Sequence, residues 1–311
     1  MNEILNSETL LKVDKLVTQF EIRNGLFGGI SGYVHAVDNI SFELKKGQTL
    51  SLVGESGCGK TTTGRSILKL EEPTSGNIFF EGKNLNAIKK EELRKMRSNM
   101  QMIFQDPFSS LNPRITVGEA IAEPMLIHNI YKGIELKEKV DELLLRVSIP
   151  REYSNRYPHE FSGGQRQRIC IARALGPKPS LIVADEAVSS LDVTIQAQII
   201  NLMMDLQEEF GISFLFISHD MAVVERISHT VAVMYLGRIV EIGSRRQVFG
   251  NPSHSYTKIL LDAVPVANPK KKRKTRNQSK KEVTSPVKPL AYKAPPIKMT
   301  EIDEGHFIAL N

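Results

Sequence analysis

The sequence contains only two cysteines, Cys58 and Cys170, and no tryptophan. Two cysteines are too few for a disulfide framework, and they exclude an all-cysteine zinc or iron–sulfur site. They also favour a reducing compartment such as the cytosol. No stretch approaches the roughly 18 consecutive apolar residues of a membrane span. The first residues lack the basic and apolar pattern of a secretory signal, so we expect no such signal.

Basic charge is concentrated at one end of the 311-residue chain. Residues 268–311 hold 11 Lys and Arg against 4 Asp and Glu, whereas residues 1–267 hold 30 against 31. The high overall pI of about 9.1 therefore does not indicate a nucleic-acid-binding body. We expect one domain over residues 1–266 and a basic, proline-rich tail over 267–311 that catalysis does not need. The apolar residues 307–310 are the part of this tail able to dock on the body as a short strand.

Short apolar runs predict the buried strands of an α/β core. They occupy residues 49–53, 181–184 and 213–217, and apolar side chains at helical spacing indicate a helix over 194–210. A strand, a helix and a second strand in this order are typical of a parallel sheet. Alternating apolar and polar residues ahead of this core predict further strands. Residues 106–175 show several helical patterns and few strand patterns, so we expect a helical insertion there.

A phosphate-binding loop follows the first buried strand. The motif G-x-x-x-x-G-K-[ST] is matched by Gly54, Glu55, Ser56, Gly57, Cys58, Gly59, Lys60 and Thr61, and Thr62 follows. Backbone N–H groups of such a loop and of the next helix face a phosphate. Lys60 supplies an ammonium group for the β- and γ-phosphates, and Thr61 supplies a hydroxyl ligand for Mg²⁺. The alternative is a glycine-rich turn that binds nothing, but the strand before the motif and the helical pattern after it favour nucleotide binding.

Cys58 within this loop has two interpretations. A thiol at a helix N-terminus has a lowered pKa and is suited to redox sensing. A buried cysteine also serves as a small apolar filler, and we favour this second interpretation.

Two adjacent acids end the second buried strand. Asp185 and Glu186 follow its apolar residues directly, and α/β sheets bind their ligands at the carboxyl ends of the strands. We expect Asp185 to hold Mg²⁺, directly or through water. We expect Glu186 to polarise the water that attacks the γ-phosphate. Acids also commonly end a strand and cap the next helix, but the phosphate loop upstream favours the catalytic interpretation.

A further segment identifies a family. The residues Phe161-Ser162-Gly163-Gly164-Gln165, followed by Arg166-Gln167-Arg168, resemble the signature motif of ATP-binding-cassette (ABC) ATPases. That motif is usually L-S-G-G-Q, and Phe161 replaces its leucine. The resemblance covers about residues 10–262. It implies an α/β P-loop NTPase fold with a mixed sheet, an N-terminal antiparallel β subdomain and a helical insert, and an ATPase that uses Mg²⁺.

The resemblance assigns four more positions. Gln105 matches the glutamine loop, which would contact Mg²⁺ and the lytic water and sense a transmembrane partner. Asp192, in Ser190-Leu191-Asp192, matches the D-loop at a dimer interface. His219 matches the switch histidine at the γ-phosphate, and Phe20 lies where an aromatic ring stacks on adenine. Taken singly, three of them have a structural alternative: a surface glutamine for Gln105, a structural histidine for His219 and a core aromatic for Phe20.

The signature segment implies a site shared between two subunits. Gly163 and Gly164 precede a helical pattern, so this segment too is expected to present N–H groups to a phosphate. In the family, two copies pair head to tail, and each signature closes the ATP site of the other copy. The resemblance therefore implies a second ABC ATPase subunit, of the same or a paralogous chain. In such a pair, Ser162, Gly163, Gly164 and Gln165 bind the nucleotide held by the other subunit.

Two segments resemble the peptide-importer branch of the family, residues 105–119 and residues 251–261, with Ser255 where the usual pattern has proline. This resemblance implies import of di- or oligopeptides, with transmembrane permease subunits and, indirectly, an extracellular solute-binding protein. It places the chain at the cytoplasmic face of the inner membrane, as a peripheral subunit without nucleic acid.

Other functions stay open at this point. The same branch also serves nickel, glutathione and some sugars. A soluble ABC ATPase acting on nucleic acid or ribosomes is a rival, although the chain lacks a second cassette and a heptad run. A degenerate subunit that only binds ATP is disfavoured by the presence of Glu186 and His219. The tail has no cysteine, which excludes an iron–sulfur site there.

Overall fold

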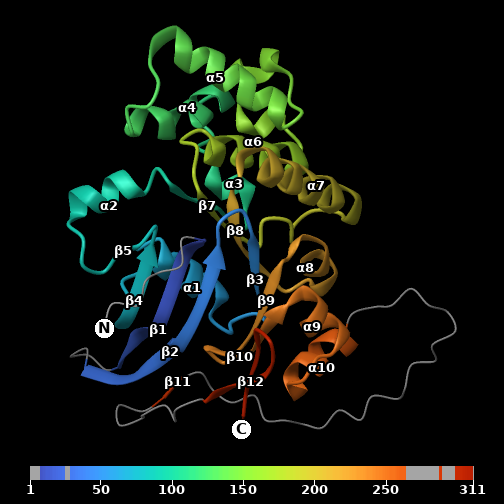
Figure 1. Ribbon diagram of the computed structural model, residues 1–311. Coiled ribbons are helices and arrows are strands. Elements are labelled where there is room, and N and C mark those ends of the chain that lie inside the picture. The colour runs from blue at the N-terminus through green and yellow to red at the C-terminus, as the bar shows by residue number, and fades with distance from the viewer. Residues whose placement is uncertain (1–7, 25–28, 264–286, 289–297, 311) are drawn as a thin grey trace, which may run out of the picture.

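The structure is a computed structural model that describes residues 8–24, 29–263, 287–288 and 298–310. Two sheets carry a helical region at the end of the molecule opposite the C-terminal strands (Figure 1). The strands are β1 (Thr9–Asn24), β2 (Gly29–Lys45), β3 (Thr49–Val53), β4 (Ser75–Phe80), β5 (Lys83–Asn84), β6 (Met100–Ile103), β7 (Leu181–Asp185), β8 (Ser213–Ser218), β9 (Thr230–Tyr235), β10 (Arg238–Ser244), β11 (Val287–Lys288), β12 (Met299–Asp303) and β13 (His306–Ala309).

The helices surround these sheets. They are α1 (Lys60–Ile67), α2 (Lys90–Met96), α3 (Pro107–Ser110), α4 (Val117–Ile127), α5 (Gly133–Arg146), α6 (Gly163–Leu175), α7 (Val193–Phe210), α8 (Met221–Ile227), α9 (Arg245–Gly250) and α10 (Ser255–Asp262), with short 3₁₀ helices at Arg151–Asn155 and Pro158–Glu160. Within the described part of the chain, no helix combines the length and the apolarity that crossing a membrane requires.

The larger sheet is mixed, in the order β12-β13-β10-β9-β3-β8-β7-β6. Its strands β6, β7, β8, β3 and β9 are parallel, and the C-terminal strands continue it antiparallel. Every residue of β3, β7 and β8 is buried, because both faces of the sheet are covered. The predicted strands and the helix over 194–210 are present, and the expected α/β fold is confirmed.

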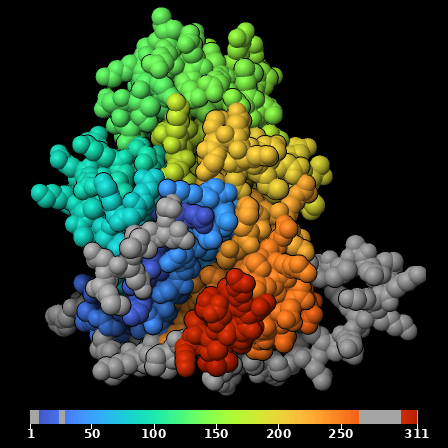
Figure 2. All heavy atoms as spheres, viewed as in Figure 1, coloured from blue at the N-terminus to red at the C-terminus, as the bar shows by residue number. Residues whose placement is uncertain are grey.

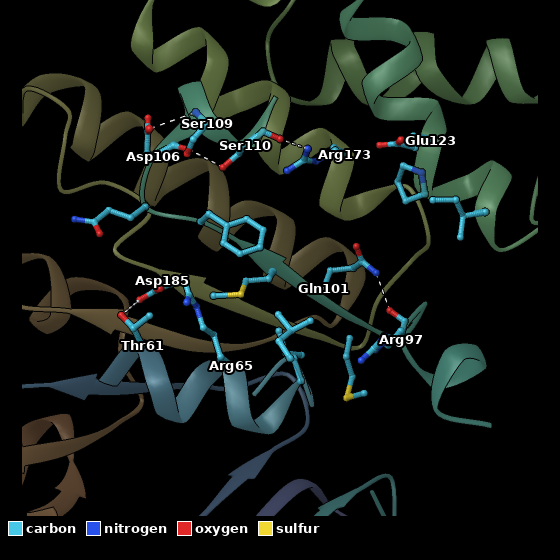
Figure 3. A pocket seen from close by; sticks show the side chains of 18 of the residues that line it. Thr61, Arg65, Arg97, Gln101, Asp106, Ser109, Ser110, Glu123, Arg173 and Asp185 are labelled. Carbon is cyan, nitrogen blue, oxygen red and sulfur yellow. Dashed lines mark hydrogen bonds between the residues drawn. The ribbon is translucent and has the colours of Figure 1, made fainter. Parts of the chain in front are cut away.

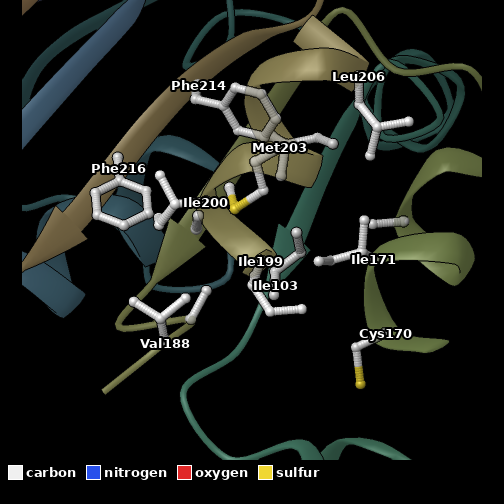
Figure 4. Packing of buried hydrophobic residues seen from close by; sticks show 14 of the residues in the cluster. Ile103, Cys170, Ile171, Val188, Ile199, Ile200, Met203, Leu206, Phe214 and Phe216 are labelled. Atoms are coloured by element: carbon white, nitrogen blue, oxygen red, sulfur yellow. The ribbon is translucent and has the colours of Figure 1, made fainter. Parts of the chain in front are cut away.

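Two apolar cores lie on the two faces of this sheet. On one face, Phe214 and Phe216 of β8 belong to the same cluster as Ile199, Ile200 and Met203 of α7 (Figure 4). On the other face, buried residues of β3 pack with those of the N-terminal sheet. Burying one phenylalanine side chain stabilises the folded state by roughly 1.5–3 kcal/mol. These clusters therefore hold the strands in their register and so fix the positions at which the strands end.

The N-terminal sheet is antiparallel, in the order β11-β2-β1-β4-β5. β1 and β2 pair along almost their whole length, with several register shifts, among them those between Val13 and Leu16 and between Leu16 and Thr18. Such bulges increase the local twist and bend the strand. The antiparallel N-terminal subdomain that the family resemblance implied is therefore present.

Residues 106–175 contain helices and no strand, in agreement with the predicted helical insertion. α4, α5 and α6 pack around a common apolar cluster that includes Ile121, Leu144 and Ile169. The exact limits of this insertion, and the division of the chain at residue 266, stay predictions.

The C-terminal residues return to the larger sheet as a hairpin. β13 pairs with β10 through Glu241↔Ile308 and Ile242↔Phe307, and β12 pairs with β13. Figure 2 shows this hairpin at the surface beside the C-terminal helices. His306 and Ala309 are buried in it. The basic run at 269–274 lies outside the described residues.

Removal of residues 298–311 should lower the melting temperature, because the apolar end of the tail docks on the body as a strand. The deletion uncovers β10 and leaves the buried Glu241 carboxylate without the His306 ring at 2.8 Å. Breaking a buried pair costs about 3–5 kcal/mol, which corresponds to a decrease in Tm of about 5 °C or more. Differential scanning calorimetry measures the shift, with Leu310→Ser as the control because Leu310 is 56% exposed. An unchanged Tm in the truncated protein would contradict a structural role for the hairpin.

Candidate functional site

The phosphate loop joins the end of β3 to the start of α1. Positive φ angles occur at three of its glycines, Gly54, Gly57 and Gly59. At Gly59, a Cβ atom would lie 1.9 Å from the carbonyl oxygen of Ala36 in β2, so the backbone leaves no room for a side chain. α1 begins at Lys60, and Thr61 and Thr62 lie in its first turn. Because the first N–H groups of a helix have no partner within it, the loop ends in donors suited to a phosphate.

Lys60 and Thr61 are both engaged with other groups of the chain. The Lys60 ammonium group is buried and donates to the carbonyl oxygens of Gly54 and Glu55, each at 2.8 Å. The Thr61 hydroxyl donates to Asp185 Oδ1 at 2.9 Å. This bond connects the phosphate loop to the end of β7, so the predicted phosphate-binding and Mg²⁺-binding side chains lie next to each other.

Asp185 is buried at the end of β7, with 4% of its surface exposed. Burial raises the pKa of its carboxyl group, the hydrogen bond from Thr61 opposes this, and the negative charge of Glu186 raises the pKa further. The surroundings therefore disfavour the charged form of Asp185, and a cation at this position would favour it.

Glu186 lies immediately after β7 and meets two other predicted site residues. One of its carboxylate oxygens accepts a hydrogen bond from Gln105 Nε2 at 2.9 Å, and the other lies 3.2 Å from His219 Nδ1. Its backbone is left-handed, with a φ of 48°, a conformation that costs a non-glycine residue about 1–3 kcal/mol. Its N–H donates to the carbonyl oxygen of Ile217 at 2.9 Å. The three side chains therefore meet, although they follow β6, β7 and β8.

The oxygen donors of this region suit Mg²⁺. This ion binds hard oxygen ligands, and proteins usually hold it through one or two carboxylates together with substrate phosphates and water. The hydroxyl of Thr61, the carboxylate of Asp185 and the amide oxygen of Gln105 supply such donors around one space. Among the described residues, no cluster of three or more His, Cys, Asp and Glu is able to hold a metal by itself. The residues fit an ion that arrives with a phosphorylated ligand.

The signature residues form the N-terminus of α6. Ser162 is the N-cap: its Oγ accepts a bond from the Gln165 N–H at 3.3 Å, and Gln165 Oε1 accepts one from the Ser162 N–H at 2.9 Å. A Cβ atom at Gly163 would make an ordinary contact, 3.8 Å from Leu191 Cδ2. This capping box fixes the helix start, as the sequence pattern predicted. No hydrogen bond between described residues connects this segment to the phosphate loop.

The D-loop segment packs against the signature helix. Asp192 caps α7 by accepting a bond from the Ile195 N–H at 3.0 Å. A Cβ atom at Gly164 would lie 2.6 Å from Ile195 Cγ2. The absence of a side chain at Gly164 therefore lets the starts of α6 and α7 touch.

Phe20 lies on β1, and its side chain is 39% exposed, which does not suit a core aromatic. It pairs with Val34 of β2, two residues before Ala36, whose carbonyl contacts the phosphate loop. Side chains two apart along a strand share a face. The exposed ring is available to a ligand, and its contact with adenine stays a prediction.

Cys58 is buried beside Lys60. Burial raises the pKa of its thiol, and the Lys60 charge opposes this. These surroundings suit a protonated, space-filling cysteine.

A cleft of about 690 Å³ opens beside this site. It lies between α1, β6, α3, α4 and α6, and Thr61, Gln101, Ser110, Glu123, Arg173 and Asp185 are among its lining residues (Figure 3). Gln105 also lines it. The cleft therefore joins the helical region to the predicted Mg²⁺ ligands.

Tyr256 of α10 is a site residue that the sequence pattern missed. Its hydroxyl accepts a hydrogen bond from the Glu55 N–H of the phosphate loop at 3.0 Å. The two residues are 201 positions apart, which hides this contact from any local motif, although Tyr256 belongs to the C-terminal segment that resembles the peptide-importer branch.

The fold and the site together define a phosphate-loop domain of the cassette type. The ABC transporter family model matches residues 37–189, and the model of the oligopeptide/dipeptide transporter C-terminal region matches residues 240–290. The chain belongs to the ABC transporter ATPases, in the branch that carries this C-terminal region. The resemblance read from the motifs is thereby confirmed.

Curated relatives include the glutathione import ATP-binding protein GsiA. The protein of Pectobacterium atrosepticum is 53% identical over 304 residues, and that of Escherichia coli (strain K12) is 52% identical over 306 residues. Each match covers 98% of this chain and 49% of the relative. The chain thus spans about half the length of the curated relatives it matches.

Two solved structures are similar. The cbiO1 structure from Clostridium perfringens, part of the ABC transporter complex cbiONQ, has a TM-score of 0.67 and 27% identity, and the match covers 78% of this chain and 92% of that chain. The dimeric post-hydrolysis structure of the cassette MJ0796, bound to ADP and Pi, has a TM-score of 0.67 and 26% identity, with coverage of 76% and 99%.

Replacement of Asp185 by Asn should stabilise the ligand-free protein at neutral pH. The pKa of Asp185 is raised in the folded state. Its favourable contribution to the free energy of unfolding is therefore present when Asp185 is protonated, and it is lost as the pH rises through that pKa. Asn resembles the protonated form and keeps an acceptor for Thr61. The gain in Tm should disappear below about pH 4, the ordinary pKa of Asp.

Thermal melts of both proteins across this pH range check this expectation. Asp220→Asn is the matched control, because Asp220 caps α8 and Asn caps as well as Asp. A neutral-pH Tm of Asp185→Asn at or below that of the wild type would contradict the argument.

Proposed function

We propose that this chain binds and hydrolyses ATP as the nucleotide-binding subunit of an importer for short peptides. The observation that carries the proposal is the meeting of Gln105, Glu186 and His219 beside the Thr61–Asp185 pair. In a chain of this family, such a group is suited to phosphoryl transfer, which depends on positioning and on charge stabilisation.

Glu186 acts as the base in this proposal. Its carboxylate is held from two sides by Gln105 and His219, which orients it toward a water molecule. The carboxylate accepts a proton from that water as the water attacks the γ-phosphate. His219, with 54% of its side chain exposed, is accessible to the γ-phosphate oxygens.

The phosphate loop provides the binding contacts. Lys60 exchanges the carbonyl oxygens of Gly54 and Glu55 for oxygens of the β- and γ-phosphates, while the N–H groups of the loop and of α1 hold the β-phosphate. The exposed ring of Phe20 stacks on adenine. Thr61, Asp185 and Gln105 hold Mg²⁺, which supplies charge neutralisation between the phosphates when bound.

Each ATP site is completed by a second cassette. The signature helix makes no hydrogen bond to the phosphate loop of its own chain among the described residues, while its free N-terminus suits a phosphate. The similar cassette MJ0796, which forms a dimer in its solved structure, supports a head-to-tail pair, formed by a second copy or by a paralogous subunit. Ser162, Gly163, Gly164 and Gln165 then face the nucleotide of the opposite subunit, and Asp192 lies at the interface.

Transmembrane permease subunits dock at the cleft that Gln105 lines. Leu70 and Ile127 also line this cleft, and they are 50% and 51% exposed, so an apolar cytoplasmic segment of a permease finds contacts there. Movement of that segment shifts Gln105 and, through the hydrogen bond between Gln105 and Glu186, also shifts Glu186. The chain is then a peripheral subunit on the cytoplasmic face of the membrane, and an extracellular solute-binding protein acts through the permease.

The cargo is a short peptide. The match to the oligopeptide/dipeptide C-terminal region supports this class, and the relatives named for glutathione import make that tripeptide the first candidate to assay. Residues 1–267 carry almost no net charge, which does not support binding to nucleic acid or ribosomes.

Glu186→Gln should retain ATP binding and lose hydrolysis. The amide keeps the size of the side chain but accepts no proton, and loss of a general base costs about 10²–10⁴ in rate. Phosphate release at saturating ATP measures kcat, and equilibrium titration measures the ATP dissociation constant. Glu208→Gln on the exposed side of α7 is the matched control. A kcat close to that of the wild type would remove Glu186 from the mechanism.

Mixing two inactive variants should restore activity if the site is shared. Lys60→Ala removes the phosphate-loop ammonium group, and Ser162→Arg blocks the signature. In a head-to-tail dimer of one copy of each variant, one of the two sites is intact. ATPase activity of the mixture, compared with each variant alone at the same total concentration, measures this rescue. A mixture no more active than its components would argue against a site shared between two copies of this chain.

A further inference from the structure

The phosphate loop is anchored from outside by a helix near the C-terminus. The peptide group between Gly54 and Glu55 donates its N–H to the Tyr256 hydroxyl at 3.0 Å. The carbonyl oxygen of Glu55 accepts bonds from Lys60 Nζ at 2.8 Å and from the Cys58 N–H at 3.3 Å. Tyr256 therefore holds the residue that in turn sets the position of the Lys60 ammonium group.

Tyr256 is itself held firmly. It is 7% exposed, and its ring packs on that of Tyr235 with the centroids 4.4 Å apart. Burial raises the pKa of its phenol, so the hydroxyl stays neutral and keeps a lone pair for the Glu55 N–H.

The start of α10 is fixed by a buried carboxylate. Glu241 of β10 is 0% exposed. Its two oxygens accept hydrogen bonds from the N–H groups of Ser253 and His254, each at 2.9 Å. Both residues immediately precede α10, in which Tyr256 is the second residue.

The C-terminal hairpin supplies a third partner for the same carboxylate. His306 Nε2 lies 2.8 Å from Glu241 Oε1, and the two side chains are 2% and 0% exposed. Burial opposes the charge of Glu241, but the neighbouring Thr257 hydroxyl together with the hydrogen bonds from Ser253, His254 and His306 holds the pKa of its carboxyl below the usual value. A continuous series of contacts thus runs from the hairpin to the phosphate loop.

We propose that Tyr256 is a positioning residue for the phosphate loop, and that the C-terminal hairpin holds it in place through Glu241. This inference rests on the proposed ATPase activity. It gives the C-terminal region a role in binding ATP, in addition to its contribution to the sheet.

Tyr256→Phe tests the first contact, because it removes only the hydroxyl and keeps the ring. Without an acceptor for its N–H, Glu55 is no longer fixed, and the loop whose N–H groups face the phosphates is less ordered before ATP binds. We expect KM and Kd for MgATP to rise about two- to tenfold, the effect of one neutral hydrogen bond. We expect kcat within about twofold of the wild type, because the Glu186 group is untouched.

The matched control is Tyr235→Phe, which removes the hydroxyl of the neighbouring ring. It should leave KM, Kd and kcat unchanged. The melting temperatures of both variants separate positioning from folding, since a merely structural role would lower Tm without a selective rise in KM. Unchanged KM and Kd in Tyr256→Phe, or an equal rise in Tyr235→Phe, would overturn the inference.

A double-mutant comparison tests the link to the hairpin. His306→Phe should raise KM in the same direction as Tyr256→Phe, whereas His306→Gln, which keeps a donor for Glu241, should stay closer to the wild type. In the double variant with Tyr256→Phe, the increase should be no larger than that of Tyr256→Phe alone, because both act through one series of contacts. Fully additive effects would disprove the link. If His306→Phe does not fold, His306→Leu, which also removes the donor to Glu241, provides the same comparison.

The wild-type measurement separates this inference from the proposed function. If the full chain neither binds nor hydrolyses MgATP, the proposed function fails. If the wild type binds and hydrolyses MgATP and Tyr256→Phe behaves like it, only the positioning role is lost.

Discussion

The parallel pairing of β3 with its two neighbours is the constraint on which the site depends. Val53 lies beside Ser218 of β8 and Val233 of β9, and Asp185 of β7 lies beside Ile217. Because β3, β7 and β8 are buried on both faces, a shift in register would exchange the side chains of the two cores and disrupt their packing. The strands therefore end at one level, and the phosphate loop, the acid pair and His219 come together there.

The polar side chains expected to meet the phosphates or the metal ion already have partners within the described chain. Lys60 bonds to carbonyl oxygens, Thr61 bonds to Asp185, and Glu186 bonds to Gln105 and contacts His219. Buried polar and charged groups without partners are costly, so these contacts stabilise the ligand-free state. Binding then exchanges one set of partners for another, and the net free energy is smaller than the sum of the new contacts.

The core and the chemistry could be predicted from the sequence because both are local. Fully buried parallel strands appear as continuous apolar runs, and the site residues follow these strands directly, as with Asp185 and Glu186. Contacts such as Glu55 with Tyr256, or Glu241 with His306, join residues 201 and 65 positions apart, and no local pattern encodes them. The full lengths of β1 and β2 were also hidden, since the bulges near Leu16 interrupt the alternation.

The hairpin also changes which strand the larger sheet presents to other molecules. Without it, β10 would be outermost, and β10 carries Ile239, Val240 and Ile242. A long apolar outer strand invites intermolecular strand addition and aggregation. β12 takes that place instead, with five residues and exposed carboxylates at Glu301 and Asp303. The last residues of the chain thus provide protection against self-association, because a short, negatively charged strand is a poor template for another copy.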